Sequence, residues 1–104
     1  MPDLYHVKIT AKALQNIQKI FDDIQKDSPQ NAAIMIERIL DAIDDLEFMP
    51  SRFRAAGRSR KHGNVMHSRV VRPYIIYYRI DEPVKAVFIV EIRPGARRQP
   101  RGFE

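Results

Sequence analysis

The sequence contains no cysteine and no long apolar run. Without cysteine, neither a disulfide framework nor a thiolate metal site can form, and nothing in the composition points to an oxidising compartment. The apolar runs fall far short of the roughly 20 residues that span a bilayer, and residues 1–10 lack the apolar stretch of a signal peptide. We therefore expect a cytoplasmic protein with no membrane segment.

Histidine is also scarce. The chain has only His6, His62 and His67, which are scattered along the sequence and show no spacing of the zinc-binding type. The sequence therefore predicts no metal site, and it offers no motif for any other cofactor.

Negative charge is concentrated in one half of the chain and is sparse in the other. The formal net charge of the 104 residues is +5. Residues 1–51 carry five basic and nine acidic residues (5 − 9 = −4), whereas residues 52–104 carry 13 basic and four acidic residues (13 − 4 = +9). A basic surface of this kind attracts an acidic protein, a nucleic acid or both. The length fits a single domain over 1–104.

The first fifty residues predict a strand followed by a helical hairpin. Over 4–10, apolar residues mostly alternate with polar ones, which is the period of a strand with one buried face. Thr10 precedes a stripe of apolar residues with helical spacing, and Ser28 and Pro29 start a second stripe as capping residue and first helical residue. Because few residues separate the two helices, they are expected to run antiparallel, and Pro50 is expected to end the second.

The second half predicts a basic loop and three strands. Residues 51–64 have no periodicity and many basic side chains, so an exposed loop is expected there. Strand-like runs begin at Val65, and the turn residues of 81–83 join the last two into a hairpin. A basic tail follows from about residue 94. The predicted fold is α+β, with an N-terminal strand and an antiparallel helical hairpin packed on one face of a small, mainly antiparallel sheet.

Several passages resemble one known family. They are "SPQNAA" between the helices, "MPSRFRAAGR" after them, the strand "YIIYYRI" and the closing "VEIRPGARR". In this order and spacing they resemble the RelE/ParE superfamily of toxins from type II toxin–antitoxin systems, which includes plasmid stabilisation proteins. The helical hairpin, the Gly-Arg pair and the terminal Gly-Ala-Arg are closer to ParE than to RelE. One departure is Pro94, where ParE sequences commonly have a histidine.

The resemblance implies three alternative functions. A ParE-like toxin inhibits DNA gyrase by binding and is neutralised by a cognate, ParD-like antitoxin within a toxin–antitoxin hetero-oligomer. A RelE-like toxin is an enzyme, a ribosome-dependent endoribonuclease that cleaves messenger RNA. The third alternative is an inactive homologue that only binds an antitoxin, which Pro94 favours. In this family the antitoxin wraps the helical hairpin and the sheet, and exposed apolar residues such as Ile34, Met35 and Phe48 are candidates for its groove.

Arginines dominate the candidate site residues. Four of them, at positions 69, 72, 93 and 97, are expected to converge on the open face of the sheet, or else to be strand-end charges paired with nearby acids. Arg79 is expected to form a cross-strand ion pair. The candidates for binding the target or the partner are Arg58, Arg60, Arg69, Arg72, Arg93, Arg97 and Arg98, and those for a nuclease are Arg69, Arg97 and His67.

Three tyrosines of the same region raise the alternative of base stacking. Tyr77 and Tyr78 are adjacent in a predicted strand, so their side chains must point to opposite faces. At least one of them is therefore expected in the core.

Overall fold

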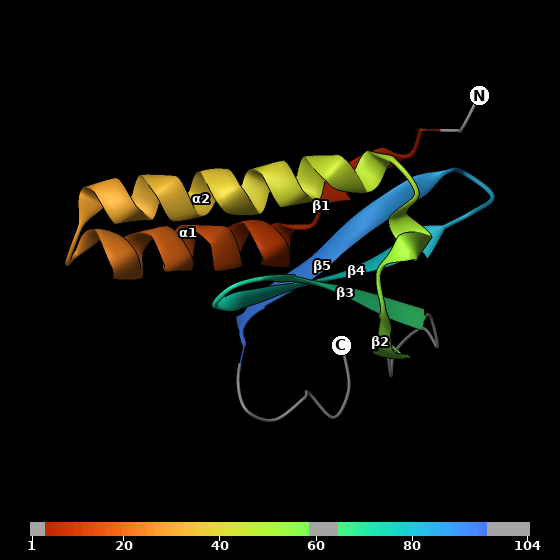
Figure 1. The fold of residues 1–104 in the computed structure, drawn as a ribbon. Coiled ribbons are helices and arrows are strands. Elements are labelled where there is room, and N and C mark those ends of the chain that lie inside the picture. Colours follow the sequence, from red (N-terminus) through yellow and green to blue (C-terminus); the bar gives the residue numbers. More distant parts are fainter. Residues whose placement is uncertain (1–3, 59–64, 96–104) are drawn as a thin grey trace.

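The computed structural model describes residues 4–58 and 65–95 and shows two layers (Figure 1). Helices α1 (Ala11–Gln25) and α2 (Pro29–Asp44) lie side by side and cover one face of a five-stranded sheet. This is the α+β arrangement predicted from the sequence. Within the described residues, no helix is both long and apolar enough to cross a membrane.

Both helices begin at the predicted capping residues. The Thr10 hydroxyl accepts a hydrogen bond from the Ala13 N–H, and the Ser28 hydroxyl accepts one from the Asn31 N–H, each at 3.2 Å. The predicted end of α2 at Pro50 is wrong. The helix ends at Asp44, and two short 3₁₀ turns follow, η1 (Asp45–Glu47) and η2 (Pro50–Arg52). Pro50 begins η2 rather than ending α2, because proline starts a helical turn more readily than it continues one.

The sheet has the strand order β1-β5-β4-β3-β2, with β1 parallel to β5 and the other pairs antiparallel. The strands are β1 (His6–Ile9), β2 (Ala55–Arg58), β3 (Val65–Val71), β4 (Tyr74–Asp81) and β5 (Ala86–Pro94). Strand β2 lies inside the segment predicted to be a loop. Its sequence "AAGR" has no alternating apolar pattern, and it forms by pairing with β3 across an irregularity between Ala55 and Gly57.

The main core lies between the helices and the sheet. Ile39 and Ile43 of α2 pack in one cluster with Ile76 and Tyr78 of β4 and Ile89 of β5. Tyr78 is fully buried, and its hydroxyl donates a 2.6 Å hydrogen bond to the Pro50 carbonyl, so the core ring also holds the η2 turn.

A second, smaller core lies on the opposite face of the sheet. Tyr77 packs there with Met66 of β3, and both are buried. The prediction that the two tyrosines point to opposite faces is confirmed, and both are packing residues, because each is at most 1% exposed. Neither offers a ring for base stacking.

Candidate functional site

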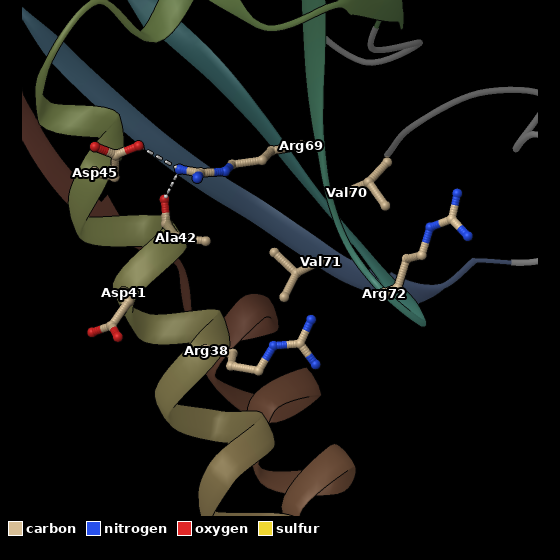
Figure 2. Close-up of a pocket in the computed structure, with 8 residues that line it drawn as sticks. All are labelled: Arg38, Asp41, Ala42, Asp45, Arg69, Val70, Val71 and Arg72. Carbon is tan, nitrogen blue, oxygen red and sulfur yellow. Dashed lines mark hydrogen bonds and ion pairs between the residues drawn. The ribbon is translucent and has the colours of Figure 1, made fainter.

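A cleft of about 610 Å³ separates the C-terminal half of α2 from β3 (Figure 2). The helix side contributes residues 38–45, and the sheet side contributes the end of β3 and the turn into β4. The lining residues are Arg38, Asp41, Ala42, Asp45, Arg69, Val70, Val71 and Arg72. Three arginines from two separate parts of the chain thus face one hollow.

Arg69 forms one wall of the cleft and is held firmly. It pairs with the core residue Ile76 across the β3–β4 ladder, so its side chain lies on the helix-covered side of the sheet. One guanidinium nitrogen, Nη1, lies 2.8 Å from the Ala42 carbonyl oxygen and 2.8 Å from Oδ2 of Asp45, as Figure 2 shows. A cation that binds a carbonyl near the C-terminal end of a helix also interacts favourably with the negative end of the helix dipole. Arg69 therefore fastens β3 to the end of α2.

Asp45 is shared between two arginines. Its Oδ2 also accepts a hydrogen bond from Arg52, which in turn donates to the Phe48 carbonyl. The guanidinium carbons of Arg52 and Arg69 lie 4.7 and 4.6 Å from the centre of the Phe53 ring. We call Asp45, Arg52 and Arg69 the Asp45 bridge. Its arginines are engaged within the protein.

Arg38 and Arg72 differ from these arginines in having no acidic partner. Both are exposed, and neither forms an ion pair among residues 4–58 and 65–95. Arg38 has only a 3.9 Å contact between Nη1 and the sulfur of Met35. In Figure 2 Arg38 extends from α2 toward the sheet side of the cleft, whereas Asp41 points away from it. These two guanidinium groups are therefore available to a ligand.

Two further hollows border the cleft and share lining residues with it. One, of about 240 Å³, shares Arg38 and is lined by Ile24, Asn31, Ile34 and Met35. The other, of about 340 Å³, shares Val70 and Arg72 and is lined by Pro73, Tyr74, Ile75 and Gly95. We call the three hollows together the α2 groove. Ile34 is 53% and Val70 60% exposed, so apolar surface flanks the two free cations.

Gly95 closes the far end of the α2 groove. Its N–H donates a 2.6 Å hydrogen bond to the Pro73 carbonyl, and a Cβ atom at this position would lie 3.0 Å from the same oxygen. The close approach of the two backbones therefore favours glycine, since a Cβ atom here would push the Pro73 carbonyl aside by a few tenths of an ångström.

Two of the three apolar groove candidates differ from the expectation, one in its exposure and one in its position. Met35 is only 7% exposed and belongs to the core, so the expectation that it is exposed is wrong. Phe48 is partly exposed but forms a bridge with Leu4, away from the lining of the groove. Ile34 alone of the three is an exposed groove residue.

The remaining predicted arginines do not converge with Arg69. Arg93 pairs with Ile75 across the β4–β5 ladder, which places it on the opposite face of the sheet. There its Nη2 lies 2.5 Å from Oε1 of Glu91, whose other oxygen lies 3.1 Å from Nζ of Lys12. We call these three residues the Glu91 bridge. The predicted convergence on the open face is wrong, because Arg69 pairs with Ile76 on the helix-covered face whereas Arg93 pairs with Ile75 on the opposite face.

Arg79 and His67 make contacts with aromatic rings that the sequence did not predict. The ion pair expected for Arg79 is absent within the described residues, because its guanidinium lies over the Phe88 ring instead, 4.1 Å from the ring centre. His67 stacks on Tyr78 with 5.4 Å between ring centres, and its Nδ1 lies 3.1 Å from the Phe53 carbonyl oxygen. Arg58 is the last residue of β2, and Arg60, Arg97 and Arg98 lie outside the described residues.

The family is decided by a sequence comparison. Residues 7–99 match the family model described as ParE toxin of type II toxin–antitoxin system, parDE. The chain belongs to the ParE toxin family. The chain also matches Y4kP, a candidate toxin of Sinorhizobium fredii, with 32% identity over 84 residues. The match covers 81% of this chain and 84% of the relative.

Solved structures agree with the fold of the ParE family. The chromosomal ParDE system of P. aeruginosa superposes with a TM-score of 0.70 at 19% identity, covering 89% of this chain and 98% of the other. The archaeal RelE–RelB complex of Pyrococcus horikoshii superposes with a TM-score of 0.63 at 18% identity, covering 91% and 99%. Both ParE and RelE proteins thus share this architecture.

Sequence reasoning missed Arg38 and Asp45. Asp45 lies directly after α2, in an acidic run that resembles a solvated helix face, and Arg38 is the only arginine in the acidic first half. The single positive charge on a negative helix is the one signal that sets Arg38 apart.

Proposed function

We propose that this ParE-family chain is a toxin that inhibits DNA gyrase and is neutralised by a cognate antitoxin. The observation that carries the proposal is the family match over residues 7–99. Under this proposal the chain acts by binding rather than by catalysis, and it forms a hetero-oligomer with its antitoxin.

The α2 groove supports the antitoxin part of the proposal. Its exposed apolar residues suit the apolar face of an amphipathic protein segment, and its two free arginines suit acidic side chains on the same segment. The basic second half of the sequence adds long-range attraction for an acidic partner.

The surroundings of His67 argue against RNA cleavage by this residue. A general acid or base must reach the proton that it transfers. The His67 ring is half-buried against Tyr78, and one ring nitrogen is directed at a backbone carbonyl. Arg69, the other described nuclease candidate, is bound to Asp45 and to the end of α2. Both groups have packing roles that a nuclease would have to give up.

Two parallel assays test the proposal. The purified protein is added to DNA gyrase with supercoiled DNA, and separately to translating ribosomes with a defined messenger RNA. Accumulated gyrase cleavage complexes without codon-linked RNA cuts are expected. RNA cuts without gyrase complexes would support the RelE-like alternative, and inactivity in both assays would support a homologue that only binds an antitoxin. Co-purification with the protein of an adjoining reading frame tests the antitoxin part.

A further inference from the structure

We propose that Asp45 sets the anion selectivity of the α2 groove. By holding Arg69, Asp45 leaves only Arg38 and Arg72 to receive a ligand, so that the groove accepts a carboxylate side chain of an acidic protein segment and disfavours a polyphosphate chain. The identity of that segment as antitoxin rests on the proposed function.

The charge of the central cleft supports a ligand with few negative charges. Its lining contains Arg38, Arg69 and Arg72 against Asp41 and Asp45, which gives 3 − 2 = +1. Arg69 and Asp45 form a bound pair, and Asp41 points away from the cleft (Figure 2), so the charges left for a ligand are those of Arg38 and Arg72. One or two carboxylates balance these charges, whereas each further phosphate of a longer chain would add uncompensated repulsion.

The apolar ends of the groove support a protein segment rather than a nucleic acid. Ile34 lies beyond Arg38 at one end, and Val70 and Ile75 lie beside Arg72 at the other. These aliphatic side chains can bury aliphatic or aromatic residues of a peptide. Stacking of bases requires exposed aromatic rings, and the only aromatic residue that lines the three hollows is the half-buried Tyr74.

Asp45 controls whether Arg69 joins these cations. The Arg69 side chain is 23% exposed, and Arg69 is one of the residues that line the cleft. Replacing the carboxylate by an amide leaves Arg69 with neutral partners only, namely the amide oxygen, the Ala42 carbonyl and the Phe53 ring. The charge of Arg69 is then no longer neutralised by a carboxylate, and the cleft becomes more attractive to polyanions.

The first test uses a single-stranded oligonucleotide as the polyanion and isothermal titration calorimetry on the full chain. The variant Asp45→Asn is expected to bind the oligonucleotide about tenfold more tightly than wild type. Adding Arg69→Gln to Asp45→Asn is expected to remove that gain. Asp44→Asn is the matched control, because it removes the same charge from the neighbouring residue, which does not line the groove. Equal gains from Asp44→Asn and Asp45→Asn would overturn the proposal.

The second test uses the purified protein of the adjoining reading frame as the acidic partner. Arg38→Gln and Arg72→Gln are each expected to weaken its binding about tenfold or more. Lys8→Gln, on the edge strand β1 outside the groove lining, is expected to change binding less than about threefold. Wild-type binding of both arginine variants would overturn the carboxylate site.

The outcomes separate the two proposals. If the adjoining protein does not bind the wild-type chain at all, the proposed antitoxin is wrong, and the oligonucleotide titration still decides the role of Asp45. If Asp45→Asn is too unstable to titrate, Asp45→Ser provides the same loss of charge with a smaller side chain. Tighter oligonucleotide than partner binding by wild type would show a nucleic-acid site and overturn the proposal.

Discussion

The Asp45 bridge and the Glu91 bridge have the same composition of charges but lie in different surroundings. Each is a carboxylate between two cations. The Asp45 side chain is 50% exposed at the end of α2, whereas the Glu91 side chain is 4% exposed on the sheet face away from the helices. A buried carboxylate depends on its cations for stability, whereas a half-exposed one is also hydrated, so its ion pairs contribute less to the stability of the fold. The comparison indicates that the fold depends on the Glu91 bridge, whereas the charge of Asp45 can be changed with little loss of stability.

The largest effect is expected when the Glu91 bridge loses both cations. The double variant Lys12→Met with Arg93→Met leaves a buried carboxylate without its two paired cations, and it is expected to lose about 3–5 kcal/mol of unfolding free energy. Urea denaturation measures the loss. Adding Glu91→Gln should restore part of the stability, because the buried charge is then gone. A loss below about 0.5 kcal/mol would place the Glu91 bridge among ordinary surface pairs.

A buried group beside the Asp45 bridge gives the next largest effect. Tyr78→Phe removes the hydroxyl that donates to the Pro50 carbonyl, and it is expected to lower the unfolding free energy by about 1–3 kcal/mol. Thermal and urea denaturation measure the change. Tyr74→Phe is the matched control, because Tyr74 is only half-buried and is expected to lose less. Equal losses would show that the Pro50 hydrogen bond contributes little.

The same tyrosine gives the protein a pH dependence. Burial raises the pKa of Tyr78 to about 12, although the nearby Arg52 and Arg69 guanidinium groups partly lower it. The unfolded chain has the ordinary pKa of about 10. Because the folded pKa is the higher one, the stabilisation is complete below pH 10 and is lost as the pH rises from about 10 toward 12. Wild type should therefore lose stability over this range more steeply than Tyr78→Phe, which urea midpoints would show. Parallel curves would contradict the assignment.

The comparison also shows which features could be predicted from the sequence. The starts of both helices were predictable, because Thr10 and Ser28 cap amides only three residues away. The partners of the arginines were not, because Arg69 and Asp45 are 24 residues apart and meet only when α2 packs beside β3. Strand β2 was missed for the same reason, since its pairing with β3 rather than its own pattern makes it a strand.

A moderate effect is expected from the cation that fastens the Asp45 bridge to the sheet. Arg69→Met loses an ion pair, a hydrogen bond to the Ala42 carbonyl and the contact with Phe53, and it is expected to lower the unfolding free energy by about 1–2 kcal/mol. Arg72→Met is the matched control three residues away, and it should change stability by less than about 0.5 kcal/mol. Equal changes in the two variants would mean that Arg69 is as free as Arg72.

The smallest effect is expected at Asp45 itself. Asp45→Asn keeps a side chain of nearly the same shape that can still accept hydrogen bonds from Arg52 and Arg69. Since the Asp45 side chain is half-exposed, the unfolding free energy should fall by less than about 1 kcal/mol. The loss should shrink further in high salt, because salt screens the ion pairs of the wild-type protein. Urea denaturation at low and high salt measures both quantities. A loss of about 3 kcal/mol that is insensitive to salt would place Asp45 with Glu91 as a structural carboxylate. A small, salt-sensitive loss would leave Asp45 free to serve selectivity, because the fold would tolerate its removal.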